Sequence, residues 1–139
     1  MAMQRVDVNR AFPFPVEKLF AHLSEHENLA PLLGARITRV RDGDDDRNGV
    51  GSVRRIRVGP GAPFEETVTA YEPNARIEYR ITRGSPLENH HGCMVFTSEG
   101  DGSRLHYTIE FEGRFPLVAP VVRAVLQRSI ERGLSRLAL

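Results

Sequence analysis

Apolar and polar residues alternate along several short segments of the chain, and this period of two is typical of β-strands with one buried face. In the first segment, residues 4–12, Val6, Val8 and Phe12 share one parity. Further segments with strand-like patterns, separated by turns rich in glycine, proline or acidic residues, cover residues 35–41, 50–58, 64–71, 76–83, 90–98 and 104–115. The connections between them are short, so the pattern predicts an antiparallel meander.

Helical spacing replaces this alternation after the first strand. Beyond Pro15, apolar residues recur every three or four positions, at Val16, Leu19, Phe20 and Leu23. This spacing predicts a short amphipathic helix. A second short helical piece is expected over residues 27–33, and Gly34 is expected to end it.

A long helix is predicted at the C-terminus, after Pro116 and Pro120 and as far as about Arg136. Its apolar face contains Ser129 and Gly133, at positions where a solid core favours large side chains. Small residues there either allow the sheet to approach closely or leave a space above it. The pattern alone is compatible with both interpretations.

Composition and charge narrow the class of protein. The length predicts one domain, residues 1–139, with a single hydrophobic core. The 19 basic residues are scattered and matched by 18 acidic ones, and tryptophan is absent, so no nucleic-acid partner is expected. The single cysteine, Cys93, excludes an internal disulfide and fits a reducing compartment. Without a signal peptide or an apolar run of about 20 residues, we expect a cytoplasmic protein that does not insert stably into membranes.

The order of these elements resembles that of the START/Bet v 1-like (SRPBCC) superfamily, and especially its bacterial polyketide cyclase/dehydrase and lipid-transport group. The segments that carry the resemblance are "FPFPVEKLFAHLSEHENLAPLL", "EETVTAYEPNARIEYRI", "NHHGCMVF" and "RGLSRL". The resemblance implies an α+β helix-grip fold. In this fold a curved seven-stranded antiparallel sheet, with two short helices after strand one, wraps around a long C-terminal helix and encloses a mostly apolar cavity. The resemblance also implies a gate loop at the cavity mouth, formed here by Gly59, Pro60, Gly61, Ala62 and Pro63.

Strand alternation, combined with the expected fold, assigns residues to the cavity. The inward parity is mainly apolar but includes a few polar residues, namely Arg54, Glu66, Tyr79, His90 and Tyr107. Folding the hairpin about Gly61 places Ile56 opposite Glu66, with Arg54 one diagonal step away and close enough for an ion pair. We expect a cavity of a few hundred cubic ångströms, as in other ligand sites. Its expected lining residues are Arg54, Ile56, Glu66, Val68, Tyr79, His90, Gly92, Met94, Tyr107, Ile109, Leu126, Ser129, Ile130 and Gly133.

Two motifs suggest metal chemistry, and neither is complete. His22, Glu25 and His26 follow the H-x-x-E-H order of inverted zinc proteases. Both histidines lie on the flank away from the apolar stripe of the first helix, and His26 is expected past the helix end. Exposure to solvent is therefore the simpler interpretation, and no third ligand is apparent. The segment "DGDDDRNG" resembles a calcium loop but lacks the required glycine and the final glutamate. No metal and no cofactor is therefore expected.

Two functions fit the expected cavity. The favoured one is binding of a small hydrophobic molecule (a lipid, an aromatic compound or a polyketide-like compound) by a carrier or sensor that is a monomer or a weak homodimer. The alternative is a polyketide aromatase/cyclase or dehydratase, with His90 as base, Tyr79 or Tyr107 as proton donor and Arg54 as electrostatic support. Binding is favoured because the sequence has no nucleophile–base–orienter triad. A protein-interaction role would instead require a large exposed apolar patch.

Overall fold

The structure, a computed structural model, describes residues 3–85, 87–113 and 117–139. In these residues seven strands form one antiparallel sheet. The strands are β1 Gln4–Phe12, β2 Arg36–Arg41, β3 Val53–Arg57, β4 Phe64–Glu72, β5 Arg76–Arg83, β6 Leu87–Glu99 and β7 Gly102–Gly113. The helices are α1 Val16–Ser24, the 3-10 helix η1 His26–Leu29, α2 Ala30–Leu33 and α3 Val118–Ser135. Phe115 and Pro116, which the sequence pattern placed in the last strand and before the last helix, lie outside the described residues.

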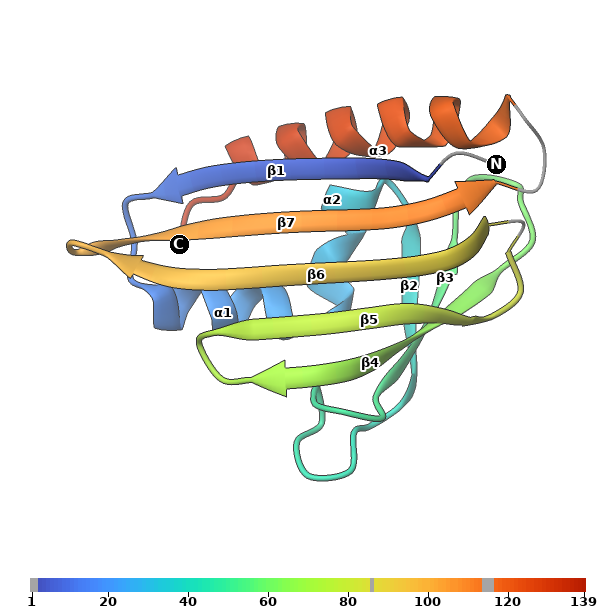
Figure 1. The fold of residues 1–139 in the computed structure, drawn as a ribbon. Coiled ribbons are helices and arrows are strands. Elements are labelled where there is room, and N and C mark those ends of the chain that lie inside the picture. Colours follow the sequence, from blue (N-terminus) through green and yellow to red (C-terminus); the bar gives the residue numbers. More distant parts are fainter. Residues whose placement is uncertain (1–2, 86, 114–116) are drawn as a thin grey trace.

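The predicted α+β helix-grip fold is confirmed. The strand order is β1-β7-β6-β5-β4-β3-β2, so every strand after β1 pairs with its neighbour in the chain and β7 returns to pair with β1. Figure 1 shows the strongly curved sheet, with α3 running along β1. The side-chain amide of Gln127 in α3 accepts from the Asp7 N–H at 3.1 Å and donates to the Asp7 carbonyl at 2.9 Å. These bonds cover backbone groups of an edge strand that would otherwise be available to another chain.

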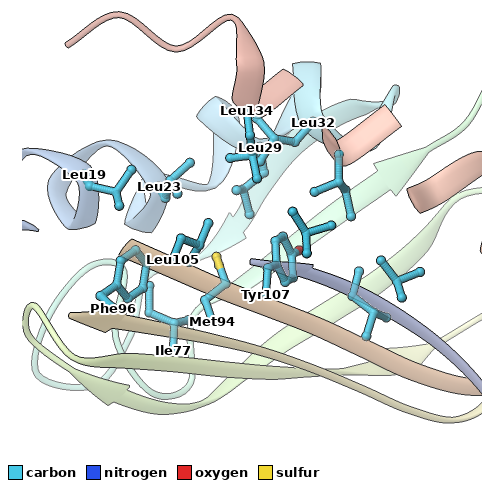
Figure 2. Packing of buried hydrophobic residues seen from close by; sticks show 14 of the residues in the cluster. Leu19, Leu23, Leu29, Leu32, Ile77, Met94, Phe96, Leu105, Tyr107 and Leu134 are labelled. Carbon is cyan, nitrogen blue, oxygen red and sulfur yellow. The ribbon is translucent and has the colours of Figure 1, made fainter. Parts of the chain in front are cut away.

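The hydrophobic core lies between the sheet and the helices. Leu19 and Leu23 of α1 are buried over the sheet, as the helical spacing predicted. Figure 2 shows them on the side opposite Leu105 and Phe96, with Leu134 of α3 close to the η1–α2 leucines. Residues of one parity on β6 and β7 are buried and their neighbours are more exposed, which is the pattern of a sheet with one covered face.

Ser129 and Gly133 mediate close contact between α3 and α2. The Ser129 hydroxyl donates to the Leu32 carbonyl at 2.7 Å. A Cβ atom added at Gly133 would lie 2.9 Å from the Leu32 Cα, closer than side chains tolerate. The sequence pattern allowed close approach of the sheet or a space beside the helix, whereas the structure brings the helix α2 against both residues.

The β3–β4 hairpin differs from the predicted register. Ile56 pairs with Phe64, and Arg54 lies directly opposite Glu66. The sequence had placed Ile56 opposite Glu66, so that prediction was wrong by one step along each strand. The reason is that the centre of the hairpin turn lies before Gly61. Gly59 has a φ of 54°, and the Gly61 N–H donates to the Val58 carbonyl at 3.1 Å.

No helix in the described ranges combines the length and the apolar character that crossing a membrane requires.

Candidate functional site

Five polar side chains meet on the inner face of the sheet, one from each strand between β3 and β7. Each is buried, although together they include two charged groups and an imidazole. We call this group the inner polar cluster; its members are Arg54, Glu66, Tyr79, His90 and Tyr107. Strand alternation had assigned all five to the inward face, and the structure brings them together.

Arg54 and Glu66 form a buried ion pair at the centre of this cluster. The Arg54 Nε donates to Glu66 Oε1 at 2.8 Å, and Nη2 lies 2.8 Å from the same oxygen. Burial alone lowers the pKa of Arg54, but Glu66, Tyr79 and Tyr107 together outweigh this effect, so the pKa rises above its ordinary value. Burial raises the pKa of Glu66, and Arg54 opposes that shift. The pair carries no net charge, which is the form in which charges are tolerated inside proteins.

Tyr79 joins the ion pair to Tyr107. Its ring centre lies 4.5 Å from the Arg54 guanidinium carbon, a cation–π distance. Gly92 is the register partner of Tyr79 across β5 and β6, and a Cβ atom there would overlap the Tyr79 ring. The tyrosine hydroxyls are hydrogen bonded to each other. Burial raises the pKa of Tyr107 to about 12 and that of Tyr79 well above 10, so both phenols keep their protons at neutral pH.

His90 enters the cluster from an irregular part of β6. The β6–β7 register shifts between Glu88 and His91, and Asn89 has a φ of 51°, so a bulge turns His90 inward. Its Nδ1 accepts the Ile81 backbone N–H at 3.0 Å, and its Nε2 lies 3.6 Å from Glu66 Oε2. Burial, assisted by Arg54, lowers the pKa of His90 to about 3. The imidazole is therefore neutral, with its proton on Nε2 facing Glu66.

A small cavity opens beside the cluster, between the sheet, α2 and α3. Its volume is about 50 Å³, roughly the space of a few water molecules. The polar groups on its wall are Glu66, Tyr79 and His90, and the rest of the wall is apolar. The full lining is Leu33, Ile56, Val58, Phe64, Glu66, Tyr79, Ile81, Leu87, His90, Ile109 and Leu126.

The structure places the sequence-predicted cavity residues in three locations. Those on the cavity wall are Ile56, Glu66, Tyr79, His90, Ile109 and Leu126. Those packed in the surrounding interior are Arg54, Val68, Gly92, Met94, Tyr107 and Ile130. Ser129 and Gly133 lie in the contact with α2, away from this wall. The cavity is smaller than the few hundred cubic ångströms expected, in part because the Tyr79 ring covers Gly92.

Several wall residues were absent from the predicted lining. Val58, Phe64 and Ile81 follow the inward parity of their strands, so alternation contained the signal for them. Leu33 comes from α2 and Leu87 from the start of β6, three residues before the predicted start of that strand. No alternation within one strand could have assigned those two residues to the wall.

The predicted gate loop, residues 59–63, connects β3 to β4 and is exposed throughout. Val58 immediately precedes it, lines the cavity and is 53% exposed. Arg57 Nε donates to the Gly61 carbonyl at 3.1 Å, and this exposed bond adds to the backbone bond between Gly61 and Val58 in holding the loop to the end of β3. The loop therefore borders the place where the cavity comes nearest to solvent.

The prediction of a solvent-facing His26 was wrong, because the structure buries this residue completely. Its Nε2 lies 3.0 Å from Ser52 Oγ, and that hydroxyl donates to the Gly49 carbonyl at 2.7 Å. Burial and the charge of Arg54 lower the pKa of His26 to about 3. The spacing contained a signal, since His26 lies three residues after Leu23 and three before Leu29 on the buried stripe.

His22 lies elsewhere, half-buried, with its Nδ1 3.4 Å from the Asn28 side-chain amide. Within residues 3–85, 87–113 and 117–139, no three His, Cys, Asp or Glu side chains are grouped so that they could hold a metal ion.

The family model for polyketide cyclase/dehydrase and lipid transport matches residues 3–139, and the chain belongs to this family. The match covers every element that contributes to the inner polar cluster. A search of curated proteins gives no match.

Solved structures share the fold at low sequence identity. The START superfamily protein from Mycobacterium smegmatis is 17% identical with a TM-score of 0.74, and the alignment covers 95% of this chain and 92% of that one. The Zhui aromatase/cyclase from Streptomyces sp. R1128 is 18% identical with a TM-score of 0.68, covering 96% and 88%. Ara h 8.0201 is 21% identical with a TM-score of 0.65, covering 97% and 100%. The chain thus has a START/polyketide cyclase-like fold of the kind that binds hydrophobic ligands.

Proposed function

We propose that this protein binds a small apolar molecule in the inner cavity, as a carrier or sensor. The observation that carries the proposal is the cavity wall itself. Apolar side chains surround the space, and its few polar groups belong to one fixed cluster. Such a combination of apolar area and a few oriented polar groups is typical of ligand sites.

The charge balance of the cluster limits the ligand to an uncharged molecule. Glu66 is the ionised group on the wall, and Arg54 already neutralises it. His90 is neutral at pH 7 because its pKa is about 3. An anionic ligand would therefore bury a charge without a partner, which is costly. We infer that the preferred ligand is neutral.

The second carboxylate oxygen of Glu66, a cavity-lining residue, further defines this ligand, because no hydrogen bond to it is found among the described residues. Oε1 of Glu66 is occupied by Arg54, whereas Oε2 lies at 3.6 Å from His90, beyond hydrogen-bond distance. A ligand hydroxyl donating to Oε2 would satisfy it with a charge-assisted hydrogen bond. The proposed ligand is thus an apolar molecule with one hydroxyl or similar donor.

Larger ligands require the mouth to open. Three residues on the cavity wall are Leu33 of α2, Val58 just after β3 and Leu126 of α3, and Val58 is adjacent to the gate loop. Movement of residues 59–63, with Val58, would widen the space without breaking the Arg54–Glu66 pair. We propose that this loop acts as the gate.

The arrangement favours binding over the acid–base alternative. A general base needs a free lone pair facing the substrate. The Nδ1 lone pair of His90 is taken by the Ile81 N–H, and its Nε2 carries the proton. The hydroxyls of Tyr79 and Tyr107 are bonded to each other rather than presented together to the cavity.

Three naphthalene derivatives of similar size, each larger than the closed cavity and therefore dependent on opening of the gate loop, test this proposal at pH 7. 2-Naphthol offers a hydroxyl donor, 2-methoxynaphthalene has no donor, and 2-naphthoate carries a negative charge. We expect 2-naphthol to raise the melting temperature, and titration calorimetry to show at least about tenfold weaker binding of 2-naphthoate. Equal binding of all three would contradict the assigned ligand polarity.

A matched pair of variants locates the binding. Leu126→Trp fills the cavity from α3, whereas Val121→Trp places the same ring on the exposed side of that helix. We expect Leu126→Trp to abolish 2-naphthol binding and Val121→Trp to leave it unchanged. Absence of binding by any uncharged compound, or undiminished binding by Leu126→Trp, would overturn the proposal.

A further inference from the structure

The solvent-facing side of α3 carries an unusual row of side chains. Leu117, Val121 and Val125 follow one another at four-residue intervals and are 81%, 61% and 63% exposed. At 100° per residue, three arginines continue the same face towards the C-terminus. We call this row the outer stripe; it consists of Leu117, Val121, Val125, Arg128, Arg132 and Arg136.

The arginines of the outer stripe are not neutralised by the protein. None of the three has a carboxylate within 4.0 Å among the described residues. Residues 118–136 contain four arginines and one glutamate, whereas the whole chain has a net charge of only +1. The positive charge on this face is therefore a local excess.

Two open grooves extend the positive surface from α3 around α2. The first, of about 620 Å³, lies between the two helices and includes all three arginines of the outer stripe in its lining. The second, of about 610 Å³, includes Arg36 and Arg57. Pro31 and Gly34 line both grooves, so the two are neighbours. The arginines thus border recesses large enough for anionic groups.

We propose that the outer stripe and these grooves bind the surface of a bilayer that contains anionic lipids. A bilayer offers phosphates at its surface and apolar material just beneath it, in the order that a helix with arginines and exposed valines requires. An acidic protein segment would pair with the arginines but would leave Leu117, Val121 and Val125 in water. Figure 1 shows α3 on the outside of the molecule, where a flat surface can reach it.

The position of the outer stripe connects it to the cavity. Leu126 lines the cavity from one side of α3, while the adjacent residue Val125 lines the outer groove between α3 and α2. At the end of α2, Leu33 likewise lines the cavity, and the adjacent Gly34 lines an outer groove. A membrane bound here would lie next to the cavity mouth. The binding itself needs no ligand, so it can fail or succeed independently of the proposed function.

Sedimentation with vesicles tests the proposal on the unmodified chain. We expect binding to phosphatidylcholine vesicles that contain 30% phosphatidylglycerol, weakening as salt is raised, and no binding to pure phosphatidylcholine. Arg128→Gln with Arg132→Gln should weaken binding by about 25-fold, roughly fivefold per arginine. Val121→Ser with Val125→Ser should weaken it by at least about tenfold.

The matched control removes the same charge from another surface. Arg80→Gln with Arg83→Gln, on the exposed residues of β5, should change vesicle binding by less than about twofold. An equal loss in this control, or no binding to anionic vesicles at low salt, would overturn the proposal. So would undiminished binding of the valine variant, since that result would indicate a soluble anion or an acidic protein as the partner. Urea midpoints like that of the unmodified protein will show that the variants are folded.

Discussion

The inner polar cluster and the outer stripe of α3 use charge in opposite ways. Inside, Arg54 has its carboxylate partner at 2.8 Å and is almost inaccessible to solvent. Outside, Arg128, Arg132 and Arg136 border one open groove and form no ion pair among the described residues. A buried charge must be paired within the protein to be tolerated, whereas water stabilises an exposed charge that has no partner. The inner arginine therefore shapes a site, and the outer ones are available for recognition.

Of the substitutions, one that breaks the buried Arg54–Glu66 pair should lower the free energy of unfolding most. Arg54→Met leaves the Glu66 carboxylate buried without its partner, and we expect the free energy of unfolding to fall by about 3–5 kcal/mol. Burial then raises the pKa of Glu66 without opposition. Because the folded state holds that proton more tightly than the unfolded state, the variant should lose stability as pH rises above about 4.5. Urea unfolding at several pH values measures both effects.

The double variant Arg54→Met with Glu66→Met is the control for this prediction. It replaces the pair by apolar side chains, so we expect it to recover most of the lost stability. A single variant that costs less than about 1 kcal/mol would show that the pair is hydrated in solution and is not the closed contact described above.

Gly92→Ala should also lower the free energy of unfolding, because a Cβ atom there overlaps the Tyr79 ring. Overpacking of this kind costs about 1–3 kcal/mol. The same substitution in a Tyr79→Ala background should cost much less, since the ring is gone. Urea unfolding of the four proteins gives the coupling energy, and additive effects would contradict the predicted contact.

The two buried histidines should destabilise the fold in acid. Both His26 and His90 have a pKa of about 3 in the folded state, against about 6.5 when unfolded. The unfolded state thus binds protons first, so stability is lost as pH falls from about 6.5 towards 3. Each histidine adds a slope of about 1.4 kcal/mol per pH unit. NMR titration of the imidazole protons checks this, and a midpoint near 6.5 for either would refute its burial.

The sequence allowed the inward faces of the strands to be predicted, because alternation depends on strand geometry alone. It placed Arg54, Glu66, Tyr79, His90 and Tyr107 on one side, where the structure finds them. The relative position of neighbouring strands was less predictable. It depends on where the turn closes, and one positive φ at Gly59 shifted the expected pairing of Arg54 with Glu66 by one step along each strand.

The cavity itself could not be predicted from residue patterns. Its volume depends on which side chains fill the space, as Tyr79 does above Gly92. Small residues on a helix are equally ambiguous, since Ser129 and Gly133 contact α2 and border the open groove between the two helices, not the inner cavity. His26 shows a further limit: its position off the apolar face of the first helix suggested exposure, whereas its spacing from Leu23 and Leu29 indicated burial.

Substitutions in the outer stripe should change the free energy of unfolding least. A small change is informative, because it separates a role in binding from a role in folding. Val121→Ser with Val125→Ser should change the free energy of unfolding by less than about 0.5 kcal/mol, since both side chains are already mostly in water and serine and valine have similar helix propensities. Val68→Ser, at a position only 3% exposed, should instead cost about 3 kcal/mol. If the α3 valines also proved costly to replace in urea unfolding, they would belong to the folding core. If they cost nothing for folding yet are needed for vesicle binding, their exposure is explained by the partner and not by the fold.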